Sequence, residues 1–455
     1  MNIIIVGAGK VGFAIAKGLT REKHDITVID TSAEKLNNIT NTMDVITICG
    51  NGASYDVLSE AGAGAADLLI AVTGADEVNL LCCLTAKKLG ARYTIARVRN
   101  PDYDRHVVFL HDELGLSMSV NPEQAAADEI SRILRLPSAT KVEPFADGGV
   151  ELVELRVAPG SKLDGLELYR LPSVCQAKVL VCAVERGDKI YIPKGDFTLE
   201  AEDRLNVVGT AREVYQFFDH VNGPKRKVRN VMILGGGRIC LHLSRQLIDL
   251  GIKVKIIENS EAQCAELKKA LPKAMIIQGD ATKPELLDEE GVATTDAFIA
   301  LTGYDENNII TSIYAAAAGA GKLITKVNES HIIKMMRGRE LDSFIQPKQL
   351  VSQIILRYVR AMQNAYDSSS VESLYHLLDG RIEALEFLVK SDSAVTNKSL
   401  KSMPIRAGTL VAAIKRGRKS FIPGGDDVIL KGDSVVIISD REGVQNLDDI
   451  LGERE

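Results

Sequence analysis

The sequence predicts an α/β protein. The predicted architecture is a tandem repeat. Each copy has a Rossmann-like domain with a doubly wound parallel sheet, followed by a small α+β domain. Three observations lead to this prediction. Short strands rich in Val and Ile alternate with helical stretches, a glycine-rich turn follows the first strand, and the same order of segments returns after residue 228. Strands that alternate with helices in this way form parallel sheets with helices on both faces.

Composition agrees with this class and disfavours several others. The chain has 455 residues, of which 45% are hydrophobic and 5% aromatic, and it contains no tryptophan. The net charge of -6, without a basic stripe, disfavours a nucleic-acid-binding protein. Seven cysteines without a CxxC pair indicate reduced thiols. We expect no signal peptide, because the chain begins directly with a strand, and no apolar run reaches the roughly 20 residues that span a bilayer.

The first 135 residues carry the alternation. Five strands are expected near residues 2–6, 26–29, 45–48, 67–72 and 93–98. The helix expected at 11–22 has Val11, Ile15 and Leu19 on one face. A helical stretch at 102–115, a strand at "MSVNP" and a helix at about 122–135 follow, and Pro122 suits the first turn of that last helix.

A smaller unit of about 75 residues comes next, with strands expected at 150–157, 178–186 and 204–209 between Gly, Pro and Asp turns. The stretch "NGPKRKV" at 222–228 then reads as a solvated linker between the two halves of the chain.

The second half repeats the first with small shifts in spacing. "IIIVGAGKVG" (3–12) matches "VMILGGGRIC" (231–240) at an offset of 228, and "LLIAVTGADEVN" (68–79) matches "AFIALTGYDENN" (297–308) at 229. "AVERGDKIYIPKGD" (183–196) matches "AIKRGRKSFIPGGD" (413–426) at 230. We therefore expect four domains, at 1–135, 140–222, 228–365 and 371–455.

The glycine-rich turn of the first copy predicts a dinucleotide site. Gly7, Gly9 and Gly12 follow a strand and open a helix, which is the context that this motif requires. The glycines permit a tight turn, close approach of the backbone to a pyrophosphate, and close helix–strand packing. Asp30 ends the second strand, where a carboxylate accepts hydrogen bonds from ribose hydroxyls. This favours NAD(H), or an adenine nucleotide with free hydroxyls, over NADP; a turn that serves packing alone is the alternative.

Other strand ends return to the same edge of the sheet. Arg97 and Arg99 share one face at the end of the fifth strand, where they would clamp further phosphates; an ion pair with Asp or Glu is the alternative. The binding residues expected in the first copy are Gly7, Ala8, Gly9, Lys10, Val11, Gly12, Asp30, Asn51, Gly52, Thr73, Gly74, Arg97 and Arg99.

The second copy keeps most of this pattern, but Cys240 replaces the packing glycine, and Lys326 and Asn328 replace the two arginines. We expect a weaker second site; a loop that no longer binds nucleotide is the alternative. The residues expected there are Gly235, Gly236, Gly237, Arg238, Ile239, Glu258, Asp280, Ala281, Thr302 and Gly303.

The chain lacks the residues of a dehydrogenase. Neither small unit contains a convincing His/Asp or Lys/Asp set, and none of the seven histidines is shared between the copies. His106 and His111 lie on one expected helical stretch, where surface positions are the simpler interpretation and metal ligands the alternative. A duplicated nucleotide site without a catalytic residue or a metal suggests a sensor, in which ligand binding shifts a conformational equilibrium.

The chain resembles the tandem RCK (KTN) family of regulatory subunits of potassium uptake systems. The segments "IIIVGAGKVG", "ITVID", "ADLLIAVTGADEVN", "ARVRNPDY" and "ILGGGRI" carry the resemblance, which covers essentially the whole chain. It implies Rossmann-like RCK N-terminal domains and small RCK C-terminal domains, with NAD(H) and ATP/ADP as ligands. It also implies a homotetramer in the cytoplasm, held at the inner face of the cell membrane by an integral membrane partner of the TrkH type. An NAD-dependent oxidoreductase and a nucleotide-sensing subunit of another membrane transporter remain as alternatives.

Overall fold

The computed structural model describes residues 1–22, 24–100, 103, 115–136, 139–145, 148–222, 228–336, 341, 343–366, 371–378, 381–440, 444 and 446–452. The helical stretch expected at 102–115 lies outside these residues except for positions 103 and 115. His106, His111 and the linker residues 223–227 also lie outside them.

The first sheet is parallel and doubly wound, as predicted. Its strand order is β3-β2-β1-β4-β5-β6. The strands are β1 (Asn2–Val6), β2 (Asp25–Asp30), β3 (Ile46–Cys49), β4 (Leu68–Ala71), β5 (Tyr93–Arg97) and β6 (Met118–Val120), and the helices are α1 (Lys10–Arg21), α2 (Ala33–Thr40), α3 (Tyr55–Glu60) and α4 (Asp76–Leu89). The order reverses between β1 and β4, so their carboxyl ends flank the crevice where such sheets bind ligands.

The second sheet repeats this topology in the order β14-β13-β12-β15-β16-β17. The strands are β12 (Asn230–Leu234), β13 (Lys253–Glu258), β14 (Met275–Gln278), β15 (Ala297–Ala300), β16 (Lys322–Lys326) and β17 (Phe344–Ile345). The helices are α10 (Arg238–Asp249), α11 (Glu261–Ala270), α12 (Pro284–Glu289), α13 (Asp305–Ala318) and α14 (Ser330–Met336). The tandem repeat read from the sequence is thus a repeat of structure.

Two small antiparallel sheets complete the fold, in the orders β10-β9-β11-β8-β7 and β18-β19-β22-β20-β21. The first contains β7 (Lys141–Phe145), β8 (Val150–Arg156), β9 (Leu180–Arg186), β10 (Lys189–Tyr191) and β11 (Arg204–Gly209), with α8 (Leu171–Cys175) and α9 (Ala211–Asn222). The second contains β18 (Val371–Leu377), β19 (Ile382–Leu388), β20 (Thr409–Arg416), β21 (Lys419–Phe421) and β22 (Ser434–Ser439). The sequence analysis did not anticipate the short edge strands β7 and β10.

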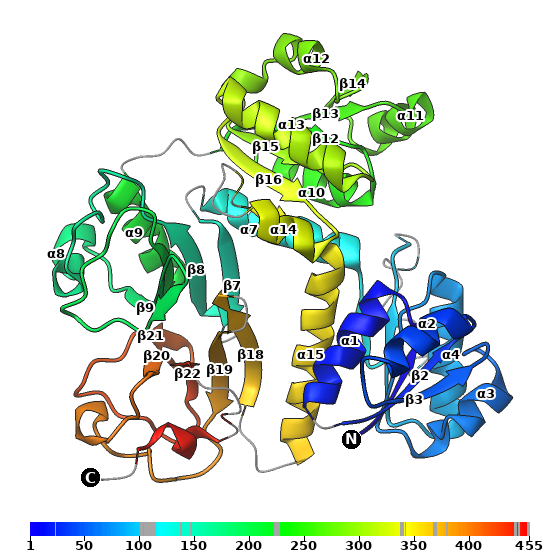
Figure 1. Ribbon diagram of the computed structural model, residues 1–455, viewed down its shortest axis with the longest axis horizontal. Coiled ribbons are helices and arrows are strands. Elements are labelled where there is room, and N and C mark those ends of the chain that lie inside the picture. The colour runs from blue at the N-terminus through cyan, green and yellow to red at the C-terminus, as the bar shows by residue number, and fades with distance from the viewer. Residues whose placement is uncertain are drawn as a thin grey trace.

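In each copy, the helix that follows the last strand of the parallel sheet packs against the other copy. The helix α15 (Pro347–Tyr366) follows the second sheet in the chain but packs beside α1 of the first copy (Figure 1), where Val351, Ile355 and Val359 are fully buried. In turn α7 (Pro122–Arg135) packs on α10 of the second copy, with Ile130 and Ile133 in that core. Each such side chain contributes roughly 1.5–3 kcal/mol by burial, so the exchange ties the two copies together.

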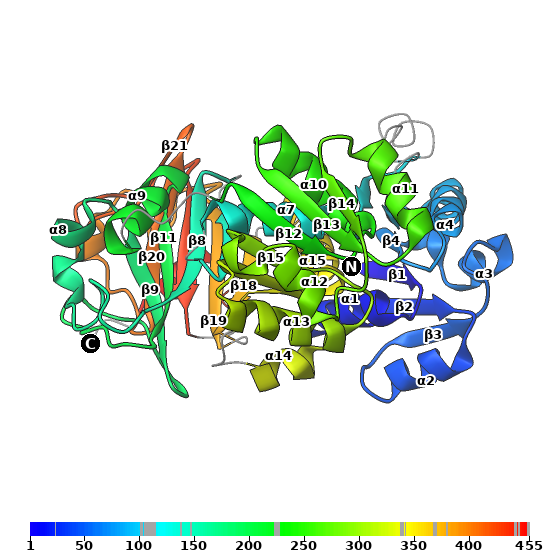
Figure 2. The same ribbon diagram turned by 90° about the horizontal axis from the view of Figure 1, so that it is seen from above.

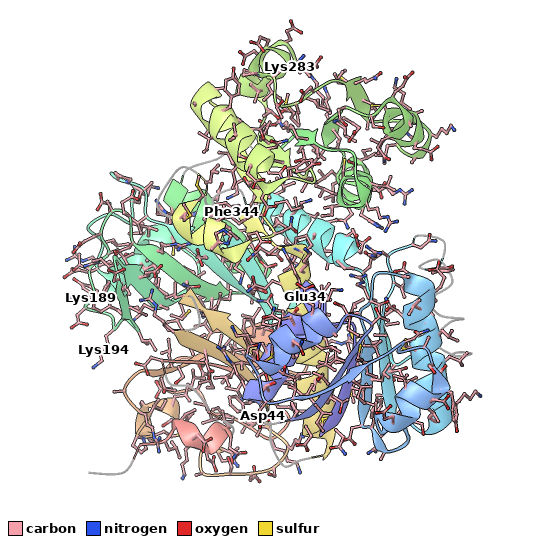
Figure 3. The ribbon with its side chains drawn as sticks, turned by 45° about the vertical axis from the view of Figure 1, so that its right-hand side comes forward. Glu34, Asp44, Lys189, Lys194, Lys283 and Phe344 are labelled. Atoms are coloured by element: carbon pink, nitrogen blue, oxygen red, sulfur yellow. The ribbon has the colours of Figure 1, made fainter. Side chains whose placement is uncertain are left out.

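The two small sheets also share a core. Val150, Leu152 and Ala183 of the first pack with Ile382 and Ile438 of the second. Lys189 and Lys194 project at the outer edge of the first small sheet (Figure 3).

Within the described part of the chain, every helix is too short or too polar to cross a lipid bilayer. Seen from above, the small sheets lie at one end of the molecule and the Rossmann-like sheets at the other (Figure 2). The four domain limits given above stay predictions.

Candidate nucleotide site

The first glycine-rich turn has the backbone geometry of a phosphate loop. Gly7 has φ +110°, a left-handed conformation that favours glycine. A Cβ on Gly12 would lie 1.8 Å from the carbonyl oxygen of Gly7, so α1 can begin this close to the strand only with glycine there. A Cβ on Gly9 would meet nothing within 4 Å. The space over Gly9, at the start of α1, is therefore open, and helix N-termini attract phosphate.

Asp30 holds this loop in place. Its Oδ2 accepts a hydrogen bond from the N–H of Ala8 at 2.7 Å, and its Oδ1 accepts one from the N–H of Ser32 at 2.8 Å. Lys35 lies 3.8 Å from the same carboxylate. Asp30 thus stands beside the glycine loop, as the sequence predicts, and it also anchors that loop to the end of β2.

The remaining loop residues divide between core and surface. The side chain of Val11 enters the core behind the loop, so only its backbone faces the crevice. Lys10 is exposed and pairs with Glu329 of the second copy. After β3, Asn51 accepts a hydrogen bond from the N–H of Ala53 at 3.0 Å, and a Cβ on Gly52 would lie 2.2 Å from Cγ1 of Val6. Gly52 thus brings this turn close to β1.

An asparagine that the sequence analysis did not select organises the turn after β4. Asn79 is fully buried. Its Oδ1 accepts hydrogen bonds from the N–H and the hydroxyl of Thr73, at 2.8 and 2.7 Å, and its Nδ2 donates to the carbonyl of Arg97 at 2.9 Å. Asp76 accepts the N–H groups of Arg99 and Asn100, at 2.7 and 2.8 Å. Asn79 and Asp76 therefore lock the ends of β4 and β5 together.

Both arginines lie over this turn. The guanidinium of Arg97 donates to the carbonyl of Thr73, and that of Arg99 donates to the carbonyl of Gly74 at 2.6 Å. Burial lowers the pKa of Arg97, and the positive charge of Arg99 lowers it further. Arg99 also lies 3.6 Å from Asp76, the acidic partner that the alternative interpretation expects. The Nε atoms of Arg97 and Arg99 are buried without a hydrogen-bond partner among the described residues, and that of Arg99 is the atom that faces Asp76.

The second loop keeps the helix entry of the first. Gly235 has φ +90°, and Gly237 precedes α10 with φ -70° and ψ -173°, close to the -71° and -177° of Gly9. Cys240 is fully buried behind it, with its Sγ 3.7 Å from the hydroxyl of Ser244. Burial raises the pKa of Cys240 to about 12, so it is a neutral thiol at pH 7.

Glu258 takes the place of Asp30 in this copy. It accepts the N–H groups of Gly236 and Ser260, at 2.7 and 2.8 Å. Gly236 is closely packed, because a Cβ there would lie 2.4 Å from Cδ1 of Leu267. Arg238 is exposed, and Ile239 packs into the core behind the loop.

In the second copy, the turn after β15 repeats the hydrogen bonds of the turn after β4. The Oδ1 of Asn308 accepts hydrogen bonds from the N–H and the hydroxyl of Thr302, at 2.8 and 2.7 Å. Its Nδ2 donates to the carbonyl of Lys326 at 3.0 Å. Asp305 accepts the N–H of Asn328 at 2.7 Å. Burial lowers the pKa of Lys326. The spacing Thr-x-x-Asp-x-x-Asn in both "TGADEVN" and "TGYDENN" is the signal that could have found these residues.

The other expected residues of the second copy lie on the same edge. Asp280 ends the turn after β14 and accepts the N–H of Thr282 at 3.0 Å, beside the half-buried Ala281. Gly303 follows Thr302, and a Cβ on it would meet nothing within 4 Å. Both edges thus combine a glycine turn at a helix start with a carboxylate at the end of the neighbouring strand. Among the described residues, no group of three or more His, Cys, Asp or Glu side chains could hold a metal ion.

Comparison with known proteins gives a consistent result. The model of the TrkA-N domain matches residues 3–122 and 231–347, and that of the TrkA-C domain matches residues 152–222 and 384–452. The chain is 34% identical to the Trk system potassium uptake protein TrkA of Halomonas elongata, with 98% of each chain covered. It is also 34% identical to a TrkA homolog of Archaeoglobus fulgidus, and the match covers 99% of this chain and 100% of that relative.

A solved structure has the same fold. The GsuK channel bound to NAD superimposes with a TM-score of 0.62 at 17% identity, over 96% of this chain and 76% of that chain. At this identity the likeness concerns the fold alone.

Proposed function

The chain belongs to the TrkA family of Trk potassium uptake proteins, and from this premise we propose that it is a peripheral regulatory subunit that binds NAD(H) and ATP/ADP and thereby gates potassium transport. The observation that carries the proposal is the glycine loop of the first copy, open over Gly9 and held by Asp30 at the switch point of a doubly wound sheet. A ligand at this point contacts the ends of several strands at once.

The partner would be an integral membrane, potassium-translocating subunit of the TrkH type, and the assembly a homotetramer at the cytoplasmic face of the membrane. The family assignment agrees with the expectation of a subunit without catalytic activity. The proposed nucleotide contacts are the residues given for each copy in the sequence analysis, with the first copy as the stronger site. NAD bound to the GsuK channel, which shares the fold, is compatible with this choice of ligand.

Calorimetry on the purified full-length chain tests the proposal. NADH, NAD+, ATP and ADP are titrated separately, and we expect saturable binding at one or two sites per chain without turnover. Co-purification with a TrkH-type membrane subunit, and potassium flux that depends on the bound nucleotide, are the expected cellular results. Steady oxidation of NADH with a small substrate at an enzyme-like rate would instead support an oxidoreductase.

The two arginines at the end of β5 should determine the preference for ATP in the first site. Arg97→Ala combined with Arg99→Ala should weaken ATP binding about five- to tenfold, and ADP or NADH binding less, because a triphosphate places more charge near the two guanidinium groups. The fold should survive, since Asn79 holds Arg97 through its carbonyl. Lys326→Ala, the matched change in the second copy, should leave the tighter ATP site unchanged. ATP binding of wild-type strength in the double variant contradicts this assignment.

A further inference from the structure

An ion pair joins the phosphate loop of the first copy to the second copy. Lys10, the first residue of α1, directly follows Gly9, and its ammonium contacts the carboxylate of Glu329. Glu329 comes after β16, where its N–H donates to Asp305 at 3.1 Å. Donation from Lys10, together with its positive charge, lowers the pKa of Glu329. A carboxylate of one copy therefore lies at the mouth of the proposed nucleotide site of the other.

The exchanged helix α15 explains this meeting. Gly18 of α1 lies against Leu356, since a Cβ on Gly18 would be 2.7 Å from its Cδ1, and Glu22 pairs with Arg360. Both pairs are 338 residues apart, so α1 and α15 run parallel in a constant register. The same register places Lys348, near the start of α15, beside Lys10. Burial lowers the pKa of Lys348, and the positive charge of Lys10 lowers it further.

The contact is not reciprocal between the copies. At the position of Lys10 the second copy has Arg238, and at the position of Glu329 the first copy has Asn100. An asparagine side chain carries no charge, so it cannot hold a cation as a carboxylate does. Among the described residues, the first loop thus meets a carboxylate of the other copy at this position, whereas the matching residue of the first copy, Asn100, is uncharged.

We infer that Glu329 is a specificity-determining residue of the first nucleotide site, where it holds Lys10 in place of a phosphate and is displaced when a nucleotide phosphate binds the loop. The inference rests on the proposed function. Glu329 neutralises the charge of Lys10 and so weakens its attraction for a nucleotide phosphate. The loss is greater for a ligand with more negative charge near Lys10, so Glu329 opposes a triphosphate more than a dinucleotide. Its displacement breaks a contact between the copies, so the occupancy of the first site changes how the copies meet.

Glu329→Gln tests the inference by calorimetry on the full chain at low ionic strength. The ion pair is exposed, with 61% of the Lys10 side chain and 42% of the Glu329 side chain accessible. Such pairs are weak, so the variant should bind ATP about two- to fivefold more tightly than wild type, and NADH with a smaller gain. At about 1 M salt, where the screening length is about 3 Å, the difference should shrink toward zero. Glu202→Gln, which removes the same charge from an exposed ion pair in the small domain, should leave ATP affinity unchanged.

A double-mutant cycle shows whether Glu329 acts through Lys10. Lys10→Gln should weaken ATP binding, and in that background Glu329→Gln should have no further effect. Equal ATP affinities of wild type and Glu329→Gln at low salt, or a loss of affinity in that variant, overturn the inference. An equal gain in the Lys10→Gln background also overturns it, because Glu329 would then act on the ligand without the lysine. If wild type binds none of the nucleotides, the proposed function itself fails.

Discussion

Gly12→Ala is expected to abolish nucleotide binding at the first site and to destabilise the fold around it. The new Cβ would lie 1.8 Å from the carbonyl oxygen of Gly7, so the loop or α1 has to move. A shift of α1 disturbs a second contact, because Gly18 is packed tightly on Leu356. Overpacking against rigid neighbours costs about 3 kcal/mol at the upper end of its usual range. Chemical denaturation together with calorimetry measures both effects.

Gly9→Ala is the matched control for that variant. Its Cβ would meet nothing within 4 Å, so stability should stay at the wild-type level. The methyl group would nevertheless stand in the space assigned to a phosphate, so binding should fall. Full ATP affinity in Gly9→Ala would place the ligand elsewhere. Wild-type stability in Gly12→Ala would show that the first loop accommodates a Cβ as readily as the second accommodates Cys240.

Asp30→Ala should weaken NAD(H) binding at the first site by roughly tenfold to a hundredfold. The carboxylate is the expected acceptor for the ribose hydroxyls, and hydrogen bonds to charged groups contribute about 1.5–3 kcal/mol each. The variant also frees the N–H of Ala8, which Asp30 holds at 2.7 Å, so the loop should become less ordered. Calorimetry with NADH gives the affinity.

Two variants separate these effects. Asp30→Asn keeps a hydrogen-bond acceptor for the loop but loses the charge, so its NADH affinity should lie between those of wild type and Asp30→Ala. Glu258→Ala makes the matched change in the second copy and should leave the first site intact. Unchanged NADH affinity in a folded Asp30→Ala variant rules out the ribose role. Loss of the tighter site in Glu258→Ala would reverse the assignment of the stronger site to the first copy.

The positions of the candidate residues were predicted from the sequence where each depends on a single strand end, while their binding role stays a prediction. Gly7, Gly12 and Asp30 follow or end strands, and a parallel sheet brings such ends to one edge whatever the rest of the chain does. The role of Asn79 was not predicted, because the repeated Thr-x-x-Asp-x-x-Asn spacing marks the residue but does not say which strands it joins. Its contacts with Thr73 and the carbonyl of Arg97 exist only once β4 and β5 are neighbours.

The sequence alone determined the doubly wound sheets, their duplication and the difference between the two loops, because each follows from local periodicity or from a direct match between segments. Only the tertiary structure decided which sheet each exchanged helix covers. The apolar face of α15 predicts burial, but hydrophobic attraction is non-directional and does not say against which partner. The packing of α15 on α1, and of α7 on α10, then brought Glu329 to Lys10 across 319 residues of chain, a meeting that no spacing within either copy encodes.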